Sequence, residues 1–257
     1  MSEQPSGLLN GLSNRLSLRR WARAARHARS MDLASLREQR SWARRFRHHL
    51  DQFIHIADDR LHIPLEGSSA MQAPHNADWT WRPELWRGRL DRPGRAAVPS
   101  KTMLGSEITL FHDCEISELT LRQMRNTREA DLAPYGLRMD VFRFDGSYLS
   151  LVVDLPASAV QGLQKRHLVR VATVVETEKP LEIFARLNVK NGPNTEQIVR
   201  ELPVTSGEVA VEFDLAYTKL NEKRVEKLWL DLIFEGPEMN QVHLRDLTMS
   251  RRPRADL

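Results

Sequence analysis

Ten arginine side chains between residues 19 and 47 give the most specific chemical signal in this sequence. A guanidinium group binds phosphate or carboxylate through two parallel hydrogen bonds, so such a cluster favours an anionic partner. Residues 1–50 hold eleven Arg, no Lys and three carboxylates, whereas the rest of the chain is net negative. We predict that the anionic partner is bound by Arg19, Arg20, Arg23, Arg26, Arg40, Arg44, Arg45 and Arg47.

The kind of anionic partner is left open by the charges alone. Basic helices that also carry Trp, here Trp21 and Trp42, are typical of proteins that lie on an anionic membrane surface. An acidic protein would be bound by the same charges, and so would nucleic acid. Nucleic acid is the less favoured partner, because the strands lack the aromatic and basic pattern of RNA-binding modules. A pair of solvated helices without any partner is the remaining alternative.

Two tryptophans, Trp79 and Trp81, are the second group that suggests binding chemistry. Residues two apart in an extended segment share one face, and an exposed pair of rings there offers a flat surface for a sugar. Amide and guanidinium groups would then bind the hydroxyls. The predicted ligand platform consists of Trp79, Trp81, Arg82, Asn188, Asn191 and Asn194. The alternative is that both rings are buried against the sheet.

Catalytic and metal-binding signatures are not found in the sequence. It contains no phosphate-binding glycine loop, no dinucleotide fingerprint, no nucleophile elbow and no zinc-protease helix motif. Cys114 is the only cysteine, which excludes an intrachain disulfide and a Cys-based zinc cluster. His48, His55 and His62 are spaced by seven, about 10 Å apart along a helix and too far apart to share one ion. We therefore expect no cofactor, no metal and no catalytic site, unless Asp231, Glu235 and Asp246 converge in a cleft.

The arginines must be positioned by two helices. Residues 15–29 are rich in Ala and Arg, which are strong helix formers. A second helix is predicted to begin near residues 30–32, where Ser30 or Asp32 can cap it. Its apolar residues, from Leu36 to Ala57, follow a and d spacing, which suits either docking on the protein's own body or a homo-oligomer formed through residues 36–57.

The tryptophans must be positioned by a proline-bearing segment and by strands. We predict three parts: a basic helical segment (1–62), a wrap with prolines and tryptophans (63–104) and a β-sandwich domain (105–257). Residues 137–155 are predicted to form two strands joined by a tight hairpin turn at Asp145-Gly146. Further strands are predicted at the following ranges: 107–111, 116–124, 167–176, 181–189, 195–202, 208–215, 227–234 and 241–249.

This pattern of short strands with turn signals between them predicts the fold class. It is mainly β, an antiparallel jelly-roll-like β-sandwich with an N-terminal pair of Arg-rich α-helices.

The run from ARLNVKNGPNTEQIVREL through EVAVEFDLAYTKL to KLWLDLIFEGPEMNQVHLRDLTMSRRPRADL resembles an uncharacterised alphaproteobacterial family of unknown function. The resemblance covers residues 140–257 and, more loosely, the Arg-rich start. It implies a bacterial cytoplasmic protein with no assigned activity. The closing strand, VHLRDLTMSRRP, is similar in style to that of carbohydrate-binding and galactose-binding-like jelly rolls, which is an analogy of fold.

The sequence therefore favours a non-catalytic binding or adaptor protein, in which basic helices hold a β-sandwich recognition module on an anionic surface or partner. The alternatives are a carbohydrate-binding module that acts in cytoplasmic glycan synthesis and an RNA-associated protein. No stretch approaches the roughly 20 apolar residues of a membrane span, and residues 1–16 lack the pattern of an export signal. We expect a cytoplasmic protein, peripheral at the inner membrane.

Overall fold

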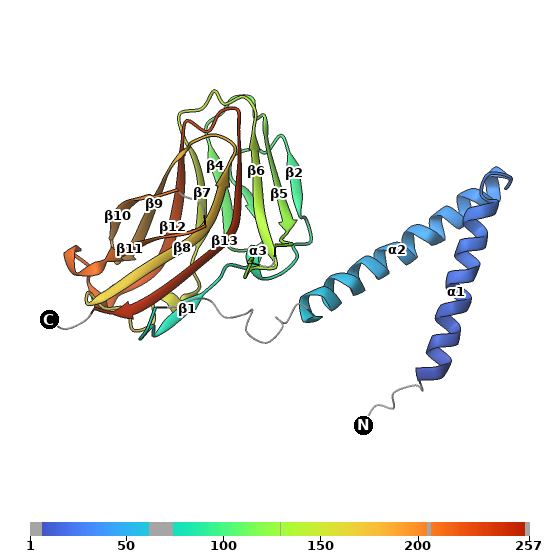
Figure 1. Cartoon of the computed structure of the whole chain (residues 1–257), viewed down its shortest axis with the longest axis horizontal. Helices are drawn as coiled ribbons and strands as arrows, with labels where there is room; N and C mark the ends of the chain where they lie inside the picture. Colours follow the sequence, from blue (N-terminus) through green and yellow to red (C-terminus); the bar gives the residue numbers. More distant parts are fainter. Residues whose placement is uncertain (1–6, 62–73, 129, 205–206, 255–257) are drawn as a thin grey trace. The chain divides into compact units, whose positions relative to one another are not determined.

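The computed structural model describes residues 7–61, 74–128, 130–204 and 207–254 (Figure 1). The chain divides into two compact units, residues 1–56 and residues 57–257. The first unit contains the Arg-rich helices and the second contains the strands, and each is described by itself.

The first unit consists of α1 (Gly7–His27) and most of α2 (Leu33–Leu61). Asp32 begins α2 as predicted: its Oδ1 accepts hydrogen bonds from the backbone N–H groups of Ala34 and Ser35, both at 3.0 Å. These bonds, that of Ser35 foremost, hold the pKa of Asp32 below its ordinary value. Because this cap sets the first turn of α2, it also sets which side of the helix each of the following arginines lies on.

The two helices contact each other through aromatic rings. Trp21 of α1 meets Phe46 of α2 edge to face, with ring centroids 5.8 Å apart. Ala24, Ala28, Leu36 and Ala43 are half-buried and lie at the 3–4 spacing of one helix face. This helical hairpin, called the basic hairpin below, consists of residues 7–56. Neither helix has a long enough apolar stretch, among its described residues, to cross a membrane.

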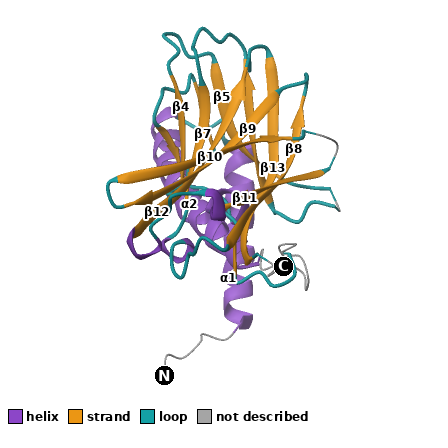
Figure 2. Cartoon of the chain, turned by 90° about the vertical axis from the view of Figure 1, so that its left-hand side faces the viewer, coloured by secondary structure: helices purple, strands orange, loops and turns teal. Residues whose placement is uncertain are grey.

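The second unit contains two antiparallel sheets that share one hydrophobic core (Figures 1 and 2). The seven-stranded sheet, sheet A, has the order β11 (Glu208–Asp214), β8 (His167–Thr177), β13 (Asn240–Pro253), β6 (Tyr135–Val141), β5 (Leu119–Arg125) and β2 (Gly94–Ala96), and β1 (Trp79–Trp81) pairs with β13. The six-stranded sheet, sheet B, has the order β10 (Asn194–Leu202), β9 (Glu182–Asn191), β12 (Val225–Glu235), β7 (Leu149–Asp154), β4 (Ile108–His112) and β3 (Thr102–Leu104). The short helix α3 (Glu84–Arg87) and three 3₁₀ turns (Ala157–Ala159, Leu215–Tyr217 and Glu222–Arg224) complete the described elements.

The alternation of each strand sends one set of side chains into the core. In β12, Leu228, Leu230, Leu232 and Phe234 are buried, whereas Trp229 and Ile233 between them are half-exposed. Trp86 of α3 is fully buried and its indole N–H donates to the carbonyl oxygen of Leu244 at 3.0 Å. The core is therefore built from both sheets and from α3, which lies between β1 and β2 in the chain.

The connections confirm the predicted fold class, a mainly β, antiparallel jelly-roll-like sandwich with an N-terminal pair of Arg-rich helices. Among the described strands from β4 onward, β5–β6 and β9–β10 are the consecutive strands that pair, and each other connection passes from one sheet to the other. The predicted strands from residue 107 onward are present, with ends shifted by a few residues and with β13 extended to Pro253.

The predicted hairpin at Asp145-Gly146 is wrong. β6 pairs with β5 and β13 in sheet A, whereas β7 pairs with β4 and β12 in sheet B. Residues 142–148 therefore cross between the sheets. Gly146 is needed there for close packing, because a Cβ atom at this position would lie 2.6 Å from Oδ1 of Asp113.

The predicted wrap is part of the sandwich. Within its described residues, 74–104, the segment supplies β1 and β2 to sheet A and β3 to sheet B. Gln123 of β5 holds it in place: its side-chain NH₂ donates to the carbonyl oxygens of Leu85 and Gly88 at 2.7 and 2.6 Å, and its Oε1 accepts from the N–H of Leu90. The strands thus begin before residue 105. The sequence did not reveal these first strands, because each is only three residues long and shows too little alternation to be recognised.

Candidate functional site

The predicted anion-binding arginines lie along both helices of the basic hairpin. All eight side chains are exposed. The guanidinium group of Arg45 lies 5.4 Å from the centroid of the Trp42 ring, a cation–π contact. Only two carboxylates, Asp32 and Glu38, occur between residues 15 and 50, against eleven Arg, so this part of the hairpin carries a large excess of positive charge.

An exposed apolar stripe runs along α2 among these arginines. Trp42, Phe46, Leu50 and Phe53 follow helical spacing and are 50–68% exposed. Phe46 of this stripe also contacts Trp21 of α1. The hairpin therefore presents cationic and apolar groups together, which is the pattern of an interfacial helix. Homo-oligomer formation through residues 36–57 stays a prediction. The side chains of His48, His55 and Ala57, and residue His62 altogether, lie outside the described residues.

Trp79 and Trp81 are brought together, but not as an exposed platform. The rings stack with centroids 6.3 Å apart. Trp81 is only 9% exposed and belongs to the core, and the half-buried Trp79 donates its indole N–H to Oγ of Ser158 at 3.1 Å. Arg82 is also buried and binds Asp246. Trp81 is part of the core and Trp79 packs against it, so the two rings do not form the exposed pair that the predicted sugar platform requires.

The three predicted asparagines lie in sheet B, whereas β1 with its tryptophans lies in sheet A. Asn191 is buried, and its Oδ1 accepts from the N–H of Asn221. Asn194 is exposed at the start of β10. Asn188 is fully buried, yet its side chain belongs to the outer face of sheet B, beside Trp229.

The outer face of sheet B is a group of residues that the sequence reasoning missed, and we call it the Trp229 face. It consists of the outward side chains of β9, β10, β12, β7 and β4, namely Phe184, Arg186, Asn188, Gln197, Val199, Trp229, Asp231, Ile233, Val152, Asp154 and Phe111. The sequence did indicate this face, because Trp229 and Ile233 are apolar residues at the alternate positions of β12 that point away from the core, where polar residues are expected.

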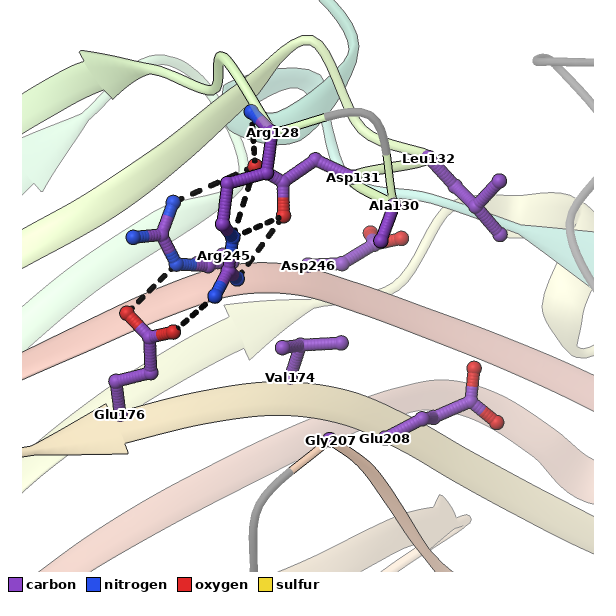
Figure 3. Close-up of a pocket in the computed structure, with 10 residues that line it drawn as sticks. All are labelled: Arg128, Ala130, Asp131, Leu132, Val174, Glu176, Gly207, Glu208, Arg245 and Asp246. Atoms are coloured by element: carbon purple, nitrogen blue, oxygen red, sulfur yellow. Dashed lines mark hydrogen bonds and ion pairs between the residues drawn. The ribbon is translucent and has the colours of Figure 1, made fainter.

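A second candidate site lies on the outer face of sheet A, a cavity of about 330 Å³. Figure 3 shows the residues that line it. We call it the Arg245 pocket, after the residue that a β-bulge in β13 turns toward it. Arg245 donates to Glu176 at 2.7 Å and lies 3.4 Å from Asp131, and Arg128 binds both carboxylates from the other side. Leu132 and Val174 provide the apolar part of the lining.

The charges of the Arg245 pocket neutralise one another. Burial opposes ionisation of Glu176, but hydrogen bonds and the positive charges of Arg245 and Arg128 outweigh it and lower the pKa of this carboxyl. Glu176 is therefore ionised at neutral pH and acts as a hydrogen-bond acceptor, not as a general acid. Burial, and next the charge of Arg245, lowers the pKa of the neighbouring His243. This arrangement can bind polar groups, and it holds no activated nucleophile among the described residues.

The three carboxylates that would have favoured an enzyme do not converge. Asp231 lies on the outer face of sheet B and is bound by Arg186, whereas Asp246 lies on the outer face of sheet A and is bound by Arg82. Glu235, at the exposed end of β12, lies two residues beyond Ile233. Across the described residues no cluster of three His, Cys, Asp or Glu side chains is suited to hold a metal ion.

Comparison with solved structures finds similar sandwiches at low identity. The enzymatically active domain of bacteriophage CBA120 tailspike protein 4 is 7% identical over 56% of this chain and 19% of that chain, with a TM-score of 0.40. The family 11 carbohydrate-binding module from Clostridium thermocellum, in complex with a β-1,3-1,4-mixed-linked tetrasaccharide, is 11% identical over 65% of this chain and 100% of that chain, with a TM-score of 0.40. The CBM22-1 xylan-binding domain from Paenibacillus barcinonensis Xyn10C is 10% identical over 63% of this chain and 94% of that chain, with a TM-score of 0.36.

No curated protein matches the sequence. The family predicted from the C-terminal run is confirmed as one without an assigned function, and its alphaproteobacterial origin stays a prediction. A single family description matches the chain from residue 1 to residue 257. The chain therefore belongs to the family of unknown function DUF6478.

Proposed function

We propose that this chain is a non-catalytic binding protein, in which the basic hairpin holds the sandwich on an anionic membrane surface. The sandwich then presents a recognition face to a second partner. The observation that carries the proposal is the coincidence, on α2, of exposed arginines with the exposed stripe Trp42, Phe46, Leu50 and Phe53.

The apolar stripe favours a membrane over the other anionic partners. Nucleic acid is bound mainly through its phosphates, and it can stack on single aromatic rings, but it offers no continuous apolar layer to a row of Trp, Phe and Leu side chains along a helix. A bilayer offers phosphates at its surface and hydrocarbon just below, and it can accept both kinds of group from one helix. In this function the protein is peripheral at the cytoplasmic face of the inner membrane.

The test is co-sedimentation of the full chain with vesicles of phosphatidylcholine alone and with phosphatidylglycerol added, at about 0.05 M and about 0.5 M salt. We expect binding to the anionic vesicles that weakens with salt. Replacing Arg40, Arg44 and Arg45 by Gln is expected to lower the affinity by about two orders of magnitude, since each basic residue near an anionic surface contributes about 1 kcal/mol.

The matched control replaces three exposed arginines of the sandwich, Arg143, Arg200 and Arg224, by Gln. It removes the same charge and is expected to leave vesicle binding within about twofold, a change below 0.5 kcal/mol by the affinity relation. Equal loss in both variants would show that net charge alone is responsible. Binding to RNA without binding to vesicles would overturn the membrane assignment in favour of a nucleic-acid partner.

A carbohydrate-binding function of the sandwich is the second candidate. The observation that favours it is the half-exposed Trp229 beside buried amide and carboxylate groups on the outer face of sheet B.

A further inference from the structure

Trp229 stands at the centre of the outer face of sheet B. Across the strands it is opposite Asn188 of β9 and Asp154 of β7. The ammonium group of Lys227 lies 5.8 Å from its ring centroid and is held there by an ion pair with Asp154 at 2.7 Å. The ring is thus fixed in place and still half-exposed, which is how an aromatic side chain serves as a contact surface rather than as core.

A buried polar network lies immediately beside the ring. Oδ2 of Asp231 accepts from Nε and Nη2 of Arg186 at 2.8 and 2.6 Å and from Nδ2 of Asn188 at 3.1 Å. Oδ1 of Asn188 in turn accepts from Nε2 of Gln197 at 3.0 Å. Four side chains from three adjacent strands are thereby locked in one orientation, and Arg186 and Gln197 remain accessible at the surface. Polar groups held in this way keep a fixed pattern of donors and acceptors for a ligand.

The centre of this face has no spare charge. Arg186 is paired with Asp231, and Lys227 is paired with Asp154. An ionic ligand would have to compete with these internal partners, whereas a neutral ligand with hydroxyl groups can add hydrogen bonds to them. The Arg245 pocket differs, because none of its lining residues is aromatic.

From this juxtaposition we infer that the Trp229 face binds a neutral, β-linked glycan chain. The inference deepens the proposed function, on which it rests, by naming the ligand class of the recognition face. In a β-linked pyranose chain the ring hydroxyls are mostly equatorial, so each sugar exposes a flat face of C–H groups that carries partial positive charge. That face packs on the negative face of the indole. The hydroxyls at the sugar's edge then reach Arg186 of β9 and Gln197 of β10, and the buried Asn188 between them holds Gln197 and Asp231 in place.

The test is affinity gel electrophoresis of the full chain in gels that contain hydroxyethylcellulose, soluble xylan, dextran or no polysaccharide. We expect retardation by at least one of the two β-linked polymers and none by dextran, whose α-linked chain does not present a continuous flat face. Trp229→Ala is expected to weaken the binding about tenfold or more, as is usual for a central aromatic contact. Gln197→Ala is expected to weaken it about threefold to tenfold.

Trp79→Ala is the matched control, since it removes a half-buried tryptophan from the other sheet. It is expected to leave retardation unchanged within about twofold. Thermal unfolding of each variant separates lost binding from lost folding. The inference is overturned if neither β-linked polymer retards the wild-type chain, or if Trp229→Ala and Trp79→Ala behave alike.

Failure here is distinguishable from failure of the membrane proposal. The gels contain no lipid, and the vesicles contain no glycan. If the chain sediments with anionic vesicles but is not retarded by any of the three polymers, the proposed membrane binding is supported and the β-linked glycan is rejected as the ligand. Retention of Trp229→Ala on vesicles at wild-type strength is expected in either case.

Discussion

Arg245 and Asp246 are consecutive in β13, yet both line the same pocket on the outer face of sheet A. Side chains that follow each other in a regular strand point to opposite faces. The bulge between Leu244 and Asp246 breaks that alternation, and it lets one strand supply two separate ion pairs. Arg245 binds Glu176, whereas Asp246 binds Arg82.

The Arg82–Asp246 pair is expected to be costly to break. Nε and Nη2 of Arg82 donate to the two carboxylate oxygens at 2.9 and 2.8 Å, and the side chains are only 6% and 13% exposed. Asp246→Asn leaves a buried guanidinium without its counter-charge, which is expected to lower the free energy of unfolding by about 3–5 kcal/mol in urea titrations. Glu212→Gln, which breaks the more exposed Arg252–Glu212 pair, is expected to cost no more than about 1 kcal/mol. Similar losses in the two variants would contradict this account.

His243 is expected to make stability depend on pH. It faces Glu176 of β8, Arg138 of β6 and Arg245 of its own strand, and burial lowers its pKa below the ordinary 6.5. The unfolded chain therefore binds a proton at this residue more readily than the folded chain does. The free energy of unfolding consequently falls as the pH drops below about 6.5 and is unaffected above it. His243→Gln is expected to make the free energy of unfolding less dependent on pH below about 6.5. An unchanged slope of this free energy against pH would show that another residue causes the dependence.

Gly146→Ala is expected to destabilise the crossing between β6 and β7 by about 1–3 kcal/mol, because the added methyl group overlaps Oδ1 of Asp113. That carboxylate cannot move without losing bonds from the N–H and hydroxyl groups of Ser147, at 2.7 and 2.6 Å. The control is the same substitution in an Asp113→Ala background, where the loss is expected to be smaller. Strict additivity of the two changes in a double-mutant cycle would rule out this clash.

Ser150→Ala is expected to be neutral or to stabilise the protein by up to about 1 kcal/mol. Oγ of Ser150 is buried between Ile233 and Phe111 on neighbouring strands and has no hydrogen-bond partner, so its removal ends an uncompensated desolvation. Thr173→Val provides the comparison, because the hydroxyl of Thr173 donates to the carbonyl oxygen of Asp246 at 2.6 Å. Its loss is expected to cost about 1 kcal/mol. Equal unfolding midpoints for both variants would contradict the prediction.

The sequence allowed the helices, most strands and the fold class to be predicted, because alternation and capping are local properties. In β12, for example, the apolar residues at alternate positions from Leu228 to Phe234 show which side chains face the core. The prediction of a hairpin at Asp145-Gly146 was wrong because a turn signal is also local. It shows that the chain bends there, but it cannot show that β6 and β7 belong to different sheets.

The candidate sites were predicted less well than the fold. Exposure of the Arg residues follows from their charge and could be anticipated. Whether Trp79 is buried depends on its pairing with β13, more than 160 residues away along the chain, and no local pattern encodes that. Trp229 could have been found as an aromatic residue in the polar phase of its strand. The bulge at Arg245 could not be predicted from the sequence, because it is a shift in the pairing register of β13 with β8, a strand far away along the chain.

The position of β13 also has a consequence for biosynthesis. Residues 240–253 lie between β8 and β6 and also pair with β1. A nascent chain that has emerged only as far as β12 leaves those three strands without their central neighbour, with the backbone groups that face β13 unpaired. The β5–β6 and β8–β11 pairs can form earlier, but sheet A is joined into one sheet only after this segment has left the ribosome, and until then β6 and β8 present open strand edges that favour aggregation.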